Sequence, residues 1–234
     1  MVSSGVTIKK GERIDDLQTN GLRIIQNPDY FRFGCDAVEL ADFVTGGVKD
    51  YACDLGSGSG IIAVLLAGKK RMRVTAVEIQ QCMAEMASRS VKLNNLSDRI
   101  EVVNVAMQNF ATAERAGTYS IVVCNPPYRK IGSGEKQSSG SIAISRHEIA
   151  VTFQEVAAVA AKLLKQGGAF YTVNQCERLA EVMSECRKFR LEPKILQILT
   201  PSGNKKPHIF LLKCVFDGKS GLSVLPEREV RTEV

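Results

Sequence analysis

The feature that most constrains the fold is a short apolar run that leads into a turn of alternating glycines. The run Tyr51–Leu55 is followed directly by Gly56-Ser57-Gly58-Ser59-Gly60, and a segment with helical character, 61–67, comes next. A buried strand, a glycine-rich turn and a helix are typical of the first unit of a nucleotide-binding α/β fold. The glycines let a ligand lie against bare backbone, and the helix start favours a carboxylate-bearing ligand. The spacing matches neither a P-loop nor a dinucleotide-binding fingerprint.

An acid at the end of the next apolar run supports this interpretation. The segment Val74–Glu78 ends in a carboxylate about 24 residues after Asp54. Nucleotide-binding folds place a ribose-binding acid at about that separation. A solvated surface acid is the alternative role for Glu78.

The rest of the chain alternates between strand-like and helix-like segments. Further strands are expected at 100–104, 119–124, 169–173, 195–199 and 209–216, and helices at 36–43, 83–94, 146–164 and 179–188, with Gly167-Gly168 ending the third of these helices. The last two strands read as an antiparallel hairpin. The pattern therefore predicts an α/β fold with a seven-stranded, mostly parallel sheet, an antiparallel last strand and helices on both faces.

A second motif, Asn125-Pro126-Pro127-Tyr128, follows the apolar run 119–124. The prolines end the strand and hold the asparagine in an extended conformation, at the sheet edge where ligands bind in such folds. A planar NH2 group could donate its hydrogens to the Asn125 side-chain oxygen and to a backbone carbonyl, while Tyr128 stacks on the ring that carries it. An ordinary turn at the end of a strand is the alternative.

Composition limits the classes of protein to consider. The 234 residues, 44% of them hydrophobic and 24% charged, fit one large domain with short extensions. A net charge of +6 permits a nucleic-acid partner without requiring one. The seven cysteines form no C-x-x-C pair, which indicates reduced thiols, a cytoplasmic protein and no metal site. Residues 1–10 lack an apolar targeting run and no run reaches transmembrane length, so we expect no membrane partner.

Together, the two motifs resemble one group of enzymes. Residues 54–60 resemble the cofactor loop of the S-adenosylmethionine-dependent methyltransferases with a Rossmann-like fold, and residues 125–128 resemble the motif of those that methylate a planar nitrogen. Segments 11–17, 24–26, 31–38, 146–148 and 206–208 resemble the tRNA1(Val) adenine-37 N6-methyltransferase family. This resemblance covers nearly the whole chain. It implies methyl transfer from S-adenosylmethionine to the N6 nitrogen of an adenine in tRNA, in the anticodon loop of a valine tRNA.

The resemblance also implies roles for single residues. The catalytic turn would be Asn125, Pro126, Pro127 and Tyr128, and cofactor would be bound by Phe33, Asp54, Gly56, Ser57, Gly58, Gly60, Glu78, Met107 and Asn125. Related enzymes usually have an acid after the third strand; Ala106 stands there, so Met107 or Gln108 is expected to contact the cofactor adenine instead. Candidate phosphate contacts are Arg129, Lys130, Lys136, Lys205 and Lys206, with plain solvated side chains as the alternative.

The same resemblance suggests boundaries and leaves alternatives open. Residues 1–34 would form an extension or lid over the cofactor, 35–216 the Rossmann-like domain and 217–234 a C-terminal extension. Residues 129–145 read as a mobile active-site loop, and His147 and Glu148 as part of a helix start rather than an acid/base pair. Rival functions are N5-methylation of a glutamine in a translation factor, methylation of DNA adenine or RNA guanine, and a catalytically silent RNA-binding module. The oligomeric state is open.

Overall fold

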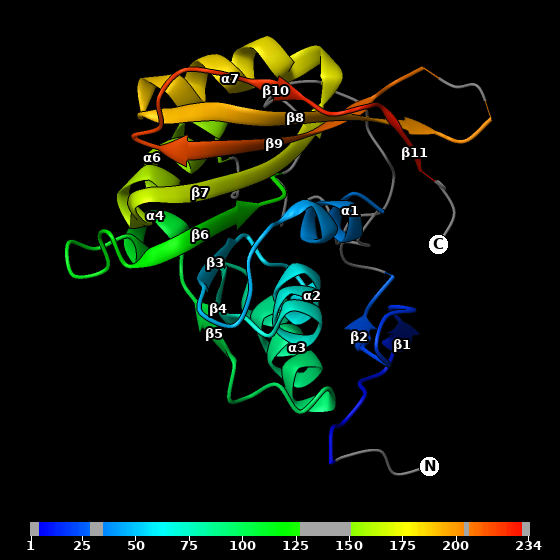
Figure 1. Cartoon of the computed structure of the whole chain (residues 1–234). Helices are drawn as coiled ribbons and strands as arrows, with labels where there is room; N and C mark the ends of the chain where they lie inside the picture. The colour runs from blue at the N-terminus through cyan, green and yellow to red at the C-terminus, as the bar shows by residue number, and fades with distance from the viewer. Residues whose placement is uncertain (1–4, 29–34, 127–150, 204–205, 231–234) are drawn as a thin grey trace.

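A single mixed sheet organises the molecule (Figure 1). The structure, a computed structural model, describes residues 5–28, 35–126, 151–203 and 206–230. The strands of the sheet are β3 (Tyr51–Leu55), β4 (Arg73–Glu78), β5 (Ile100–Asn104), β6 (Tyr119–Cys124), β7 (Leu164–Gln175), β8 (Leu191–Pro201), β9 (Ile209–Phe216), β10 (Ser223–Val224) and β11 (Arg228–Val230). The strand order is β10-β8-β9-β7-β6-β3-β4-β5, and β11 also pairs with β8.

The seven predicted strands are all present, and the predicted fold class is confirmed. Strands β3 to β7 run parallel, whereas β9 pairs antiparallel with both β7 and β8. The additional strands β10 and β11 pair parallel with β8. The sequence pattern did not indicate these two strands, because most of their side chains are exposed and carry no apolar alternation.

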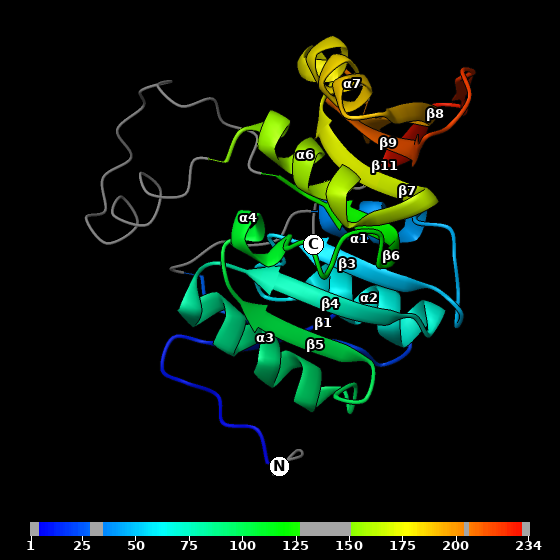
Figure 2. The same ribbon diagram turned by 90° about the vertical axis from the view of Figure 1, so that its left-hand side faces the viewer.

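Helices cover both faces of the sheet (Figure 2). They are α1 (Cys35–Phe43), α2 (Ile61–Lys70), α3 (Gln81–Leu93), α4 (Met107–Phe110), α6 (Phe153–Leu163) and α7 (Leu179–Lys188), with a 3-10 turn at Cys176–Arg178. One apolar core joins the sheet to α1, α2 and α3, and a second joins it to α4, α6 and α7. Strand side chains alternate between these cores, so that Tyr171 lies in the first core and Phe170 in the second. Among the described helices, none is long and apolar enough to cross a membrane.

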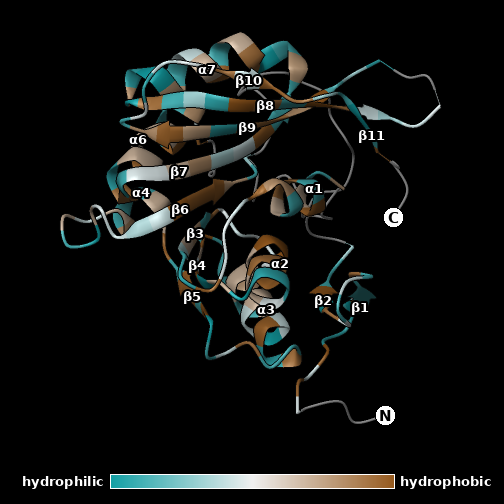
Figure 3. Cartoon of the chain, viewed as in Figure 1, coloured by the Kyte–Doolittle hydropathy of each residue, from teal (hydrophilic) through white to brown (hydrophobic). Residues whose placement is uncertain are grey.

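Helix α2 is the most apolar of the described helices, and most of its length is coloured as hydrophobic in Figure 3. Every residue from Ile61 to Ala67 is buried. The helix ends with Arg71 in a left-handed conformation, after Lys69 and Lys70 in the last turn. Lys70 donates to the carbonyls of Ala41 and Asp42 and also contacts that of Val44, so the C-terminal ends of α1 and α2 are tied together.

Two sequence expectations around α6 are wrong. A helix over 146–164 was expected, but Thr152 is the N-cap of a helix that begins at Phe153 (residues 146–150 lie outside the described residues). The Thr152 hydroxyl accepts from the Glu155 amide, and the Glu155 carboxylate accepts from the Thr152 amide, which completes a capping box. Gly167-Gly168 does not end the helix either. Both glycines lie within β7, beside an irregularity in its pairing with β6.

Replacing Thr152 with alanine removes one half of this capping box. We expect Thr152→Ala to lower the free energy of unfolding by about 1 kcal/mol, because the amide of Glu155 loses its acceptor. Urea denaturation measures the change. Thr112→Ala, at an exposed threonine between α4 and β6, is the matched control. Equal stability of the two variants would contradict the importance of the cap.

The N-terminal part of the chain forms a separate hairpin on α3. Strands β1 (Arg13–Asp16) and β2 (Arg23–Gln26) pair antiparallel, and β2 lies along α3. The Asn94 side chain accepts from the Arg23 amide at 2.8 Å and donates to the Arg23 carbonyl at 2.6 Å. The Ser90 hydroxyl accepts from the Ile25 amide at 3.1 Å. These bonds fix the hairpin beside the helix that begins just after Glu78.

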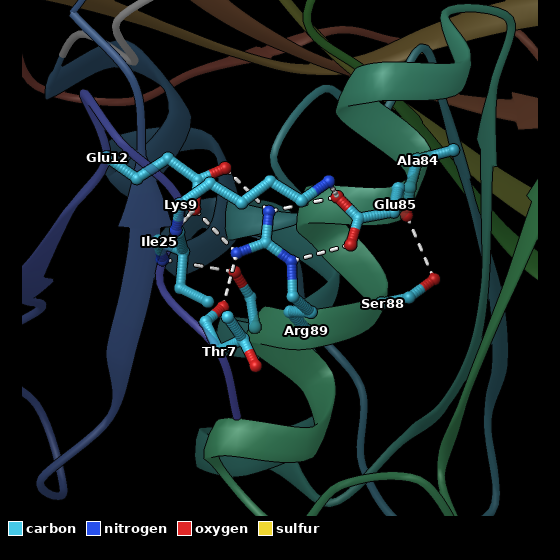
Figure 4. Close-up of polar contacts among 9 residues, drawn as sticks. Thr7, Lys9, Glu12, Ile25, Ala84, Glu85, Ser88 and Arg89 are labelled. Atoms are coloured by element: carbon cyan, nitrogen blue, oxygen red, sulfur yellow. Dashed lines mark hydrogen bonds and ion pairs between the residues drawn. The ribbon is translucent and has the colours of Figure 1, made fainter. Parts of the chain in front are cut away.

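An ion cluster centred on Arg89 completes this attachment (Figure 4). The guanidinium donates to both carboxylate oxygens of Glu12 at 2.6 Å, to Glu85 at 2.7 Å and 2.9 Å, and to the Thr7 carbonyl at 2.8 Å. Bidentate pairs of this kind are among the stronger polar contacts in proteins. The Arg89 guanidinium lowers the pKa of Glu12, and it lowers that of Glu85 to about 2.

Neutralising Glu12 should loosen the hairpin. We expect Glu12→Gln to lower the local stability of the hairpin by about 2 kcal/mol, since a charge-assisted bidentate contact is lost. Hydrogen exchange at the amides of Ile24 and Ile25 measures the effect, with the exposed Glu114→Gln as control. Because the pKa of Glu12 is lowered, its contribution is complete above the ordinary value of 4.5 and disappears as the pH falls through the lowered value. Unchanged exchange in the variant would exclude this anchoring role.

Candidate active site

The two sequence motifs lie on neighbouring strands at the same edge of the sheet. Leu55 of β3 is in register with both Val77 of β4 and Cys124 of β6. Gly56 and Asn125 follow these paired residues directly, so the two turns leave the sheet about 4.8 Å apart, one strand spacing. Strand β3 is also where the strand order reverses, which is the binding position in open α/β sheets.

Hydrogen bonds to the last two residues of β4 hold the glycine turn in place. The amides of Gly56 and Ser57 both donate to the Val77 carbonyl, at 2.9 Å and 3.0 Å, and the Gly58 amide donates to the Glu78 carboxylate at 2.8 Å. Gly56 has a φ of +70°, and a Cβ added there would meet open space. The backbone conformation therefore requires glycine, while the space above the turn is left for a ligand.

Asp54 lies at the end of β3 with an unsatisfied carboxylate. The residue is 1% exposed, and neither of its oxygens has a hydrogen-bond partner among the described residues. Burial raises the pKa of Asp54 to about 7, and the charge of Glu78 adds to this rise. The backbone N–H of Ala63, in the first turn of α2, is near enough to oppose the rise but does not have the geometry of a hydrogen bond to either oxygen. The Ser57 hydroxyl beside it is also buried without a partner among these residues. An arrangement of this kind suits a cationic ligand group, which would restore the ionised carboxylate.

Glu78 holds the turns that follow β3 and β4 together. It is 5% exposed, and its oxygens accept from the amides of Gly58 and Gln80, each at 2.8 Å. Burial raises the pKa of Glu78, and these backbone amides oppose the rise. A carboxylate offers about four acceptor positions, so the two bonds leave capacity for the hydroxyls of a ligand.

Sequence reasoning missed Asn104, the last residue of β5. It is in register with Glu78, and its side-chain amide donates to the carbonyls of Glu78 and Ile79 at 2.8 Å and 2.9 Å. These bonds fix the turn after β4. The signal that could have identified Asn104 is a polar residue at the carboxyl end of a predicted parallel strand, β5. The carboxyl ends of parallel strands lie at the same edge of the sheet, so this side chain was bound to lie near the ends of β3 and β4.

Residues 106–108 begin α4 at the same edge. Ala106 is the N-cap, Met107 is partly buried against the second core, and Gln108 is exposed and donates to Glu155 at 3.3 Å. No carboxylate stands at 106–108. The adenine contact assigned to Met107 therefore remains a prediction.

The predicted catalytic turn is only partly within the described residues. Asn125 is half-buried and Pro126 is buried at the end of β6. Lys206 is exposed in the segment before β9, which starts opposite the last residue of β7, so it lies at this edge as well. The remaining expected site residues lie outside the described residues: Phe33, Pro127, Tyr128, Arg129, Lys130, Lys136 and Lys205. The loop 129–145 and the pair His147 and Glu148 lie outside them too.

The described part of the site thus has two halves with different chemistry. Asp54, Ser57 and Glu78 offer buried oxygen acceptors around a bare backbone turn. Asn125 and Pro126 offer an amide and a carbonyl on the next strand. A ligand that spans the β3–β6 boundary would contact both halves at once.

Comparisons with known proteins agree with this arrangement. The family model described as "Methyltransferase small domain" matches residues 40–190. A curated relative from Shewanella woodyi, named tRNA1(Val) (adenine(37)-N6)-methyltransferase, is 28% identical over 76% of this chain and 74% of its own length. A relative of the same name from Bacteroides thetaiotaomicron is 26% identical over 87% and 83%.

Solved structures share the fold. A predicted O-methyltransferase from Agrobacterium tumefaciens has a TM-score of 0.66 at 22% identity, covering 83% of this chain and 86% of that chain. The geranyl diphosphate C-methyltransferase of Streptomyces coelicolor, solved with Mg2+, geranyl diphosphate and S-adenosyl-L-homocysteine, has a TM-score of 0.56 at 14% identity, covering 77% and 76%. The matched family model spans more than half of the sequence and includes both halves of the site. The chain therefore belongs to the methyltransferase small domain family.

Proposed function

We propose that this protein transfers a methyl group from S-adenosylmethionine to the exocyclic N6 nitrogen of an adenine in tRNA, in the anticodon loop of a valine tRNA. The observation that carries this proposal is the placement of Asp54 with its glycine turn and of Asn125-Pro126 on adjacent strands at one sheet edge. The names of the curated relatives supply the tRNA substrate.

The residues of the glycine turn suit this cofactor. S-adenosylmethionine supplies an electrophilic methyl group on a sulfonium, together with an α-ammonium, an α-carboxylate, a ribose diol and an adenine. The unpartnered Asp54 carboxylate would bind the α-ammonium, and the bare turn with the start of α2 would bind the α-carboxylate. Glu78 would accept from the ribose hydroxyls, and Phe33 and Met107 would contact the adenosine. The N-terminal hairpin on α3 would hold the segment that contains Phe33 as a lid.

The catalytic turn would act by alignment. The lone pair of an adenine N6 is delocalised into the ring, so the amino group is a poor nucleophile. The Asn125 side-chain oxygen and the Pro126 carbonyl would accept its two hydrogens and favour a pyramidal nitrogen. As the nitrogen–carbon bond forms, the carbon–sulfur bond breaks, and one amino proton leaves to solvent. Tyr128 would hold the base by stacking, worth about 1–3 kcal/mol.

A single-stranded loop suits this site, because a base must leave its stack to reach the end of β6, and that costs least where it is unpaired. The basic residues at 129, 130, 136, 205 and 206 would contact phosphates. All seven cysteines are free thiols, which fits a reducing compartment, so we place the protein in the cytoplasm with its tRNA.

The test is methylation of bulk tRNA from a strain that lacks this protein. Incubation with labelled methyl donor should give labelled N6-methyladenosine in digested tRNA, and the signal should fall as salt rises because phosphate contacts weaken. Label in protein but not in RNA would contradict the proposal and favour glutamine methylation. Failure to bind S-adenosylmethionine would favour a silent RNA-binding module.

A further inference from the structure

Asn174 is a buried polar residue at the carboxyl end of β7, the strand next to β6. Strand β7 is the neighbour of β6, and their last paired residues are Cys124 and Thr172. Asn174 follows Thr172 by two residues, as Pro126 follows Cys124. Asn174 is therefore two residues beyond the last paired position, at the sheet edge where the chain leaves β6 through Asn125 and Pro126.

The side chain of Asn174 combines complete burial with an unused donor. It is 0% exposed, and its Oδ1 accepts from the Gln175 amide at 2.9 Å. Because a backbone amide can only donate, this bond fixes which end of the side chain is oxygen. The Nδ2 group is therefore the end of the side chain that does not contact the Gln175 amide, and it has no acceptor among the residues that the structure describes. Buried donors are nearly always paired, so an unpaired one beside a binding edge indicates a missing acceptor.

The strand alternation places Asn174 opposite the cofactor half of the site. Phe170 of β7 packs against Phe153 of α6, with ring centroids 6.4 Å apart. Asn174 is on the same face of β7 as Phe170, whereas Asp54 is on the α2 face of β3, near Ala63. A base held at Asn125 and Pro126 would therefore have the methyl donor on one side and the Asn174 amide on the other.

Building on the proposed function, we propose that Nδ2–H of Asn174 donates to a ring nitrogen of the acceptor base and so orients the base for methyl transfer. In adenine, the amino group is flanked by two ring nitrogens, N1 and N7, and both are hydrogen-bond acceptors. Guanine also has an unprotonated ring nitrogen, N3, beside its amino group, so this contact alone does not separate the two purines. Its effect would be to fix the orientation of the acceptor base in a turn that accepts any planar NH2.

The test compares full-length wild type and Asn174→Leu on tRNA with adenosine, 1-deazaadenosine or 7-deazaadenosine at the target position. We expect the wild type to lose about 10- to 100-fold in kcat/KM on one of the two analogues, because a hydrogen bond to a buried group is lost. On adenosine, the kcat/KM of Asn174→Leu should be lower than that of the wild type by a similar factor. Replacing adenosine by that analogue should then lower the kcat/KM of the variant no further. The identity of the analogue tells whether N1 or N7 is recognised.

A second variant guards against a purely structural effect. Asn174→Asp keeps an oxygen for the Gln175 amide but has no Nδ2 donor, so it should show the same pattern as Asn174→Leu. The dissociation constant for S-adenosylmethionine should stay the same in both. Equal activity of the variants and wild type on adenosine, or a further loss on both analogues, would overturn the assignment. Absence of tRNA methylation by the wild type itself would instead reject the proposed function.

Discussion

Asn125→Ala is expected to lower kcat for methyl transfer by at least about 100-fold, a typical effect of removing one preorganised polar group from an active site. The half-buried amide stands at the end of β6, one strand from the glycine turn, where it would accept a hydrogen from the target amino group. The dissociation constant for S-adenosylmethionine should stay near that of the wild type, because Asp54, Ser57 and Glu78 are unchanged. Single-turnover transfer to tRNA and equilibrium binding of the cofactor measure the two effects.

The matched control for this substitution is Asn109→Ala, at an exposed asparagine of α4. It should leave both measurements unchanged. If Asn125→Ala loses both cofactor binding and methyl transfer, the role proposed for Asn125 is wrong, and Asn125 belongs to the cofactor half of the site.

Asp54→Asn should weaken binding of S-adenosylmethionine by at least about 100-fold, since breaking a buried ion pair costs roughly 3–5 kcal/mol. The substitution keeps the size of the side chain and removes the charge that would face the α-ammonium. Isothermal titration calorimetry measures the loss. Asp98→Asn, at an exposed acid before β5, is the control.

The same variant should change the pH dependence of stability in the cofactor-free protein. Burial raises the pKa of Asp54 from its ordinary 3.8 to about 7, so the folded carboxyl keeps a proton that the unfolded one releases. This group therefore lowers the free energy of unfolding as the pH rises from 3.8 to about 7, by a total on the order of 4 kcal/mol.

Asp54→Asn removes this titration, whereas burial still raises the pKa of Glu78 in both proteins. The variant should thus gain stability relative to the wild type between pH 4 and pH 8. Denaturation curves at several pH values check the sign, and a constant difference across this window would contradict the buried, unpaired carboxylate.

The central strands could be predicted because burial on both faces makes them continuous apolar runs. Tyr51–Leu55 and Tyr119–Cys124 begin and end as expected. The start of α6 was missed because the capping box at Thr152 and Glu155 outweighs the apolar stripe that predicts a longer helix. The anchoring of the hairpin by Arg89 could not be predicted, since Arg89 and Glu12 are 77 positions apart in the sequence and neither carries a local signal.

That the candidate residues lie together could be predicted, because strand ends in a parallel sheet share one edge. Asp54, Glu78 and Asn125 all occupy that edge. What could not be predicted from the sequence is which polar groups of the site lack a hydrogen-bond partner. The unpartnered oxygens of Asp54 and the unused donor of Asn174 depend on what the fold brings near them. Asn104 was overlooked because its partners are backbone carbonyls, which every residue has and which no sequence motif marks.

The reversal of strand order at β3 has a consequence for biosynthesis. When the ribosome has released the chain only through β5, the glycine turn already has its neighbour β4, but the other side of β3 is bare. Strand β6 closes that side through contacts such as the Tyr51 amide with the Ser120 hydroxyl, 69 positions later. The nascent polypeptide thus brings the two halves of the candidate site together only after residues 119–126 have emerged, and a chain that ends before them lacks the half that contains Asn125.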